Sequence, residues 1–90
     1  MTRMFVRHTV KDYPAWRKGY DAFDAKRRSL GVTAHGVYRA IDNANDVTAW
    51  HDFASTEQAM AFVRSDELKN AMMNAGVQGA PTIWITTSEV

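Results

Sequence analysis

A chain of 90 residues has room for one hydrophobic core, so we expect a single domain over residues 1–90. Its 11 basic and 10 acidic residues give a formal net charge of +1, which argues against charge-driven binding of nucleic acid. The absence of cysteine excludes disulfides, thiolate catalysis and cysteine metal sites. No apolar run is long enough for a signal peptide or a membrane span, so we expect no membrane association and a cytoplasmic location.

The chain opens with a predicted strand at residues 3–10, which is rich in β-branched and aromatic side chains. Residues 12–30 follow as a predicted amphipathic helix, with Asp12 as its N-cap and Gly31 at its end. One face of this helix follows spacings of three and four residues: Tyr13, Trp16, Tyr20, Phe23, Arg27 and Leu30. So many large rings need a sheet to pack against.

Two further strands are predicted at residues 32–41 and 47–54. The polar residues 42–46 between them are typical of a hairpin turn. A second helix begins at Ser55 with a capping-box pattern, restarts at Ser65 and ends at Gly76.

Turn-forming residues then precede a last strand at residues 82–87. The resulting order βαββαβ predicts an α+β, ferredoxin-like fold. Its sheet is expected to be antiparallel, with the first and third strands central and both helices on one face.

Both faces of the predicted strands carry large apolar side chains, although a sheet that faces water on one side should be polar there. The helices cover only one face. The simplest cover for the other is a second copy of the chain, so we expect a homodimer joined through the helix-free face of the sheet.

Several short signatures resemble those of the dimeric α/β-barrel superfamily, which includes antibiotic-biosynthesis monooxygenases and small polyketide-cyclase-like proteins. They are Arg7-His8, Asp12-Tyr13, Trp16, Tyr38-Arg39, residues 68–72 and residues 75–77. The resemblance implies a dimeric α/β barrel with a pocket between the sheet and the helices or the partner. It also implies a small apolar or aromatic ligand.

The phase of the strands decides which side chains line the space between two sheets. Bulky rings pack best on small partners, so we expect Ala34, Gly36 and Ala40 to lie under the helices with Tyr38 and Trp50. The helix-free side then holds His35, Val37, Arg39, Ile41, His51 and Phe53. The opposite phase, with Trp50 and Asp52 facing that space, stays open.

His51 is the candidate catalytic base, because free histidine titrates near neutrality and its neighbours are apolar. Arg39 is the candidate anion clamp, since pairing Ile41 with Val47 across the hairpin brings it within reach of His51. The alternatives are a histidine that bonds across the dimer interface and an arginine that pairs with a partner's acid. The predicted substrate-binding residues are His8, Tyr13, Val37, Phe53 and Trp84.

No pair of histidines has the spacing of a metal site, and no nucleotide-binding loop is present, so we expect neither metal nor cofactor. Two functions remain open. One is a cofactor-independent monooxygenase or cyclase that acts on an aromatic, polyketide-like molecule. The other is a non-enzymatic module of the same fold that binds a ligand or only assembles.

Overall fold

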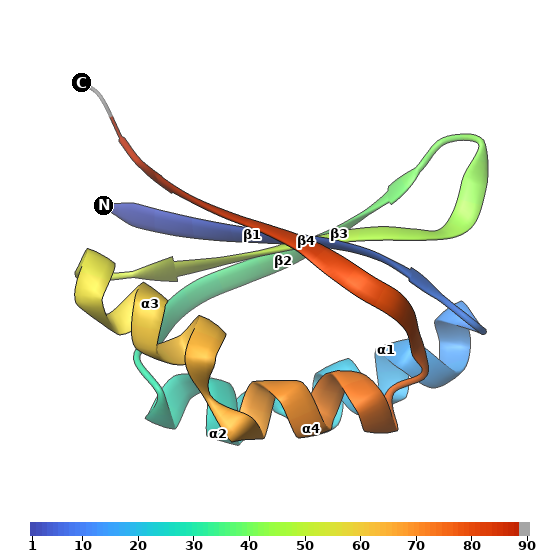
Figure 1. Ribbon diagram of the computed structural model, residues 1–90, viewed down its shortest axis with the longest axis horizontal. Helices are drawn as coiled ribbons and strands as arrows, with labels where there is room; N and C mark the ends of the chain where they lie inside the picture. Colours follow the sequence, from blue (N-terminus) through green and yellow to red (C-terminus); the bar gives the residue numbers. More distant parts are fainter. Residues whose placement is uncertain (89–90) are drawn as a thin grey trace.

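The computed structural model describes residues 1–88, in which four helices lie against one face of a four-stranded antiparallel sheet (Figure 1). The elements in chain order are β1 (Thr2–Val10), α1 (Tyr13–Ala22), α2 (Asp24–Ser29), β2 (Val32–Ala40), β3 (Asn43–Phe53), α3 (Thr56–Arg64), α4 (Asp66–Asn74) and β4 (Val77–Thr87). The strand order β2-β3-β1-β4 places the first and third strands in the centre. The predicted ferredoxin-like fold is therefore confirmed.

The prediction of one continuous helix over residues 12–30 is wrong, because the chain bends at Phe23 between α1 and α2. At the bend the carbonyl of Tyr20 accepts hydrogen bonds from the Phe23 N–H at 3.3 Å and from Arg27 Nη2 at 2.9 Å. A helix bends where its backbone carbonyls find other donors, and here an arginine side chain is one of them. Gly31, with φ of 100°, ends α2 as predicted.

The second helical segment divides as the sequence predicts. The hydroxyls of Ser55 and Ser65 each accept a hydrogen bond from an N–H three residues later, both at 3.2 Å, and so cap α3 and α4. Gly76, with φ of 80°, follows the end of α4. These local signals are short-range, which is why the sequence alone locates them.

The hairpin between β2 and β3 is tighter than predicted. Only Ile41 and Asp42 form the turn, and β3 already begins at Asn43. The predicted pairing of Ile41 with Val47 is wrong by two residues, since Arg39 is the partner of Val47. A register irregularity next to Arg39 takes up the additional residues of β3.

The last strand is longer than predicted, because β4 begins at Val77 rather than at residue 82. It includes Pro81, whose missing N–H is tolerated because β4 is an edge strand that pairs only with β1. Gly79, with φ of 72°, lies where the register between β4 and β1 shifts. The turn formers therefore mark an irregularity within the strand rather than its start.

The predicted phase of the sheet is also wrong. Val47, Ala49, His51 and Phe53 are buried in the core that the helices cover, so Trp50 and its same-face neighbours lie on the helix-free side. The small residue Gly36 accommodates the sheet's own tryptophan rather than rings from the helices. A Cβ at Gly36 would lie 2.6 Å from the ring of Trp50.

A row of aromatic residues crosses the helix-free face. Trp50 pairs with Gly36 and Phe5, and Phe5 pairs with Trp84. The rings of Phe5 and Trp84 stack with centroids 5.2 Å apart, and Trp84 is 41% exposed. Asp52 shares this face and is buried beneath the side chain of Arg3, with which it forms an ion pair at 2.6 Å. The phase left open in the sequence, with Trp50 and Asp52 on this side, is the one observed.

Within residues 1–88, no helix combines the length and the apolar character needed to cross a membrane.

Candidate functional site

A cavity of about 40 Å³ lies between the sheet and the helices α1, α2 and α4. Its lining is mostly apolar, with five residues that carry polar groups: His8, Trp16, Tyr20, Arg27 and His51. A water molecule needs about 10–15 Å³ of such volume, so the cavity has room for a molecule of two or three heavy atoms. Gly19 of α1 and Ala75 close it on the helix side, where a Cβ at Gly19 would lie 3.0 Å from the Ala75 Cβ.

His8 of β1 is the least satisfied polar side chain of the cavity. It is 6% exposed, and no group within residues 1–88 forms a hydrogen bond with either of its ring nitrogens. Burial lowers the pKa of His8 to about 4, so the ring is neutral at pH 7. A neutral imidazole has one N–H donor and one free lone pair, so His8 has a nitrogen at the cavity that can accept a proton.

His51 of β3 is held in one tautomer. Arg27 Nε donates a hydrogen bond to its Nε2 at 3.1 Å, so the ring proton resides on Nδ1. That Nδ1 is buried and has no hydrogen-bond partner in the described part of the chain. Burial, and then the charge of Arg27, lower the pKa of His51 to about 3. His51 is therefore a neutral hydrogen-bond donor at the cavity rather than a free base.

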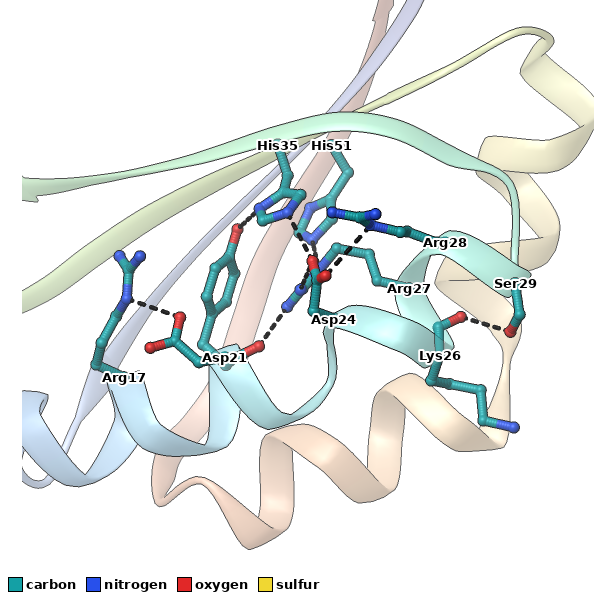
Figure 2. Close-up of polar contacts among 10 residues, drawn as sticks. Arg17, Asp21, Asp24, Lys26, Arg27, Arg28, Ser29, His35 and His51 are labelled. Carbon is teal, nitrogen blue, oxygen red and sulfur yellow. Dashed lines mark hydrogen bonds and ion pairs between the residues drawn. The ribbon is translucent and has the colours of Figure 1, made fainter.

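A polar network connects this histidine to the surface of the helix layer. Figure 2 shows His35 and His51 side by side, with Asp24 and Arg27 against them. Asp24 Oδ1 lies 3.1 Å from His35 Nε2 and 3.5 Å from Arg27 Nη1. His35 Nδ1 lies 2.5 Å from the hydroxyl of Tyr20. Burial raises the pKa of Tyr20 and lowers that of Arg27, so both side chains are shielded from water.

The structure brings only part of the predicted site together. His8 and His51 both line the cavity. The prediction that Arg39 approaches His51 is wrong, because its guanidinium lies 4.0 Å from the ring centroid of Tyr13 and outside the cavity lining. Val37 and Phe53 pack in the core without lining the cavity, and Trp84 lies on the opposite face of the sheet.

The arginine beside His51 is instead Arg27, which the sequence reasoning assigned to no site. One signal was present, because Arg27 is the only charged residue in the apolar stripe of the first helix. Tyr20, Asp24 and His35 gave no such signal, since their contacts join different elements.

Within residues 1–88, no three side chains of histidine, aspartate or glutamate are grouped as a metal site.

The sequence matches no family model and no curated protein. Solved structures resemble the fold closely. SnoaB from Streptomyces nogalater, a cofactor-independent oxygenase, gives a TM-score of 0.80 and 12% identity over 99% of this chain and 93% of SnoaB.

Two further structures are described as those of candidate antibiotic biosynthesis monooxygenases. The protein from Caulobacter crescentus gives a TM-score of 0.78 and 16% identity, over 99% of this chain and 90% of that one. The protein from Nitrosomonas europaea gives a TM-score of 0.74 and 11% identity, over 98% of each chain. The chain therefore has the fold of the antibiotic biosynthesis monooxygenase-like proteins, in agreement with the resemblance found in the sequence.

Proposed function

We propose that this protein is a cofactor-independent monooxygenase that oxidises an aromatic, polyketide-like substrate in the cavity between sheet and helices. The observation that carries the proposal is His8, a buried neutral imidazole with an unused lone pair, in the wall of an apolar cavity. The fold shared with SnoaB, a cofactor-independent oxygenase, supports the same reading.

The chemistry requires a substrate whose C–H is acidified by flanking rings and a carbonyl. His8 takes that proton, and the resulting carbanion is itself the reductant of dioxygen. Dioxygen adds to the carbon as a peroxide, and loss of water leaves a carbonyl, so one O₂ is consumed and one water released for each CH₂ oxidised to C=O. The apolar walls keep bulk water away from the carbanion before oxygen adds. A cyclase would share the first step, with the carbanion attacking a carbonyl instead.

The cavity of about 40 Å³ holds dioxygen but not a fused-ring substrate. An aromatic substrate therefore requires the cavity to widen, and we propose that it does so between α1 and the end of α4, where Gly19 meets Ala75. Small side chains on both helices leave no interlocking groups to break there.

We also propose that the working form is a homodimer joined through the helix-free face. The support is the aromatic row of that face, in which Trp84 of β4 is 41% exposed. Tyr38 of β2 lies on the same face and is 67% exposed. A monomer in water would leave these rings solvated.

Oxygen uptake with anthrone tests the function, because anthrone has an acidic CH₂ that becomes the carbonyl of anthraquinone. We expect wild type to consume oxygen well above the buffer rate, and His8→Gln to lose about 100-fold in rate, in the usual range for a general base. Thr9→Val, an exposed neighbour in the same strand, is the matched control and should retain the wild-type rate.

Wild type that oxidises anthrone no faster than buffer would refute the oxygenase proposal for this class of substrate. Quenching of Trp16 fluorescence by anthrone without turnover would favour the alternative, a ligand-binding module, since Trp16 lines the cavity.

A further inference from the structure

Arg27 is a buried cation without a full counter-charge. Its side chain is 2% exposed, and it donates hydrogen bonds to the neutral ring of His51 and to the carbonyl of Tyr20. Among the described residues its one ion-pair partner is Asp24, at 3.5 Å, and the charge of Asp21 acts on it without an ion pair. A buried charge normally has a close and well-aligned counter-ion, because removing it from water is costly. The Asp24 contact is long for that purpose.

The charge of Asp24 is also divided among several partners. Its carboxylate lies 3.2 Å from Arg28 Nε and 3.1 Å from His35 Nε2, and its side chain is 39% exposed. Water and these neighbours therefore take up much of its negative charge. The positive charge of Arg27 remains incompletely neutralised at the inner wall of the cavity.

The same cavity has buried nitrogens with no partner. His51 Nδ1–H is a donor without an acceptor, and one nitrogen of His8 carries a second free N–H. Both rings are more than nine-tenths buried, so bulk solvent does not satisfy them. Buried N–H donors without a partner are costly, and beside a cation the acceptor that would satisfy them best is one with a negative charge.

We propose that the inner end of the cavity is a binding site for an anionic oxygen group, with Arg27 as its charge partner and His51 as its hydrogen-bond donor. The inference rests on the cavity of the proposed function and deepens it, because it states that the ligand is held as an anion. Arg27 then has the anion-binding role that the sequence analysis predicted for Arg39.

Two sources supply an oxygen anion of this kind. One is the enolate or phenolate oxygen of an aromatic ligand, which requires the helices to separate. The other is a di- or triatomic anion that fits the cavity of about 40 Å³ as it stands. Reduced dioxygen belongs to the second kind.

Three probes separate these sources. Azide, a triatomic anion, tests the cavity at its present size by its effect on the ring resonances of His8 and His51. Para-nitrophenol tests the aromatic source, because its anion absorbs visible light and its bound pKa can be read directly. Para-nitroanisole is its neutral match. We expect the pKa of bound para-nitrophenol to fall by at least about one unit, a tenfold preference for the anion, and para-nitroanisole to bind more weakly.

Variants assign the effect to Arg27. Arg27→Gln should abolish the pKa shift of the bound probe and the azide response. Asp24→Asn removes the partial counter-charge while keeping its shape, so it should strengthen anion binding about three- to tenfold. Asp21→Asn is the matched control, because Asp21 forms its ion pair with Arg17 at the exposed surface of α1 and none with Arg27, so its effect should be clearly smaller than that of Asp24→Asn. If Arg27→Gln does not fold, the Asp24→Asn arm still decides.

A saturable azide response alone supports the small-anion source, and a lowered pKa of para-nitrophenol supports the aromatic source. Para-nitroanisole that binds as tightly as para-nitrophenol rules out the aromatic source. The proposal is overturned if azide has no effect and the aromatic source is also ruled out, or if Asp24→Asn weakens anion binding. An inactive protein that still shifts the probe pKa would refute the oxygenase and leave the anion site standing. An active enzyme in which neither azide nor para-nitrophenol responds would refute the anion site and leave the oxygenase standing.

Discussion

At the scale of single residues, His8 and His51 tie the stability of the fold to pH. Each has a pKa of 6.5 when unperturbed, and burial lowers these values to about 4 and about 3 in the folded state. As the pH falls below 6.5, the unfolded chain takes up protons that the folded chain does not. The free energy of unfolding therefore decreases on acidification, by up to about 1.4 kcal/mol per pH unit for each histidine.

We predict that urea unfolding gives a clearly smaller free energy at about pH 5 than at about pH 7. The Arg7 guanidinium lowers the pKa of Asp46 below its ordinary value of 3.8. This carboxylate therefore affects stability only as the pH falls toward that value, below the two pH values compared. His8→Gln should roughly halve the loss of unfolding free energy, because only His51 then has a pKa that differs between the folded and the unfolded chain. Equal stability at the two pH values would contradict the buried, neutral state of both rings.

At the scale of elements, the contact between β2 and β3 on the helix-free face limits the side chain at one position. A methyl group at Gly36 would lie 2.6 Å from the ring of Trp50, so we predict that Gly36→Ala destabilises the fold by about 1–3 kcal/mol through overpacking. Thermal unfolding measures the effect.

The matched experiment repeats the substitution in a Trp50→Leu background, where the ring is absent. There Gly36→Ala should be nearly neutral, because alanine suits a strand better than glycine does. The same cost in both backgrounds would show that Trp50 does not lie over Gly36.

At the scale of the whole molecule, the two faces of the sheet predict how copies of the chain associate. Figure 1 shows every helix on one side of the sheet and none on the other. We predict a homodimer through the helix-free face, and sedimentation equilibrium of Trp84→Asp should show monomers, since a carboxylate there would be buried without a partner.

Met73→Asp is the control for that experiment. Met73 is 75% exposed on α4, on the helix side, so its replacement should leave the dimer intact. A wild-type protein that is monomeric at micromolar concentration, or a dimer lost in Met73→Asp and kept in Trp84→Asp, would rule out this interface.

Local patterns in the sequence were sufficient for the order of the elements and the fold. Ser65 marks the start of a helix because its hydroxyl accepts a hydrogen bond from an N–H only three residues away. Gly31 and Gly76 mark the ends of helices because glycine adopts positive φ without strain. The apolar character of both sheet faces was also predictable, since alternation along a strand divides its residues between the two faces and each set contains large apolar side chains. The ring and charge spacing likewise placed Arg27 on the buried side of its helix.

Only the tertiary structure decided which face of the sheet the helices cover. Alternation divides a strand into two sets of residues but does not say which set meets the helices, and here both sets contain large apolar groups. The helix side of the sheet accommodates His35 and His51 because α1 and α2 supply polar partners for both rings. His51 meets Arg27 across 24 residues of sequence, and Tyr20 meets His35 across 15. A contact between side chains on separate elements is fixed by how those elements pack, and no spacing within one element encodes it.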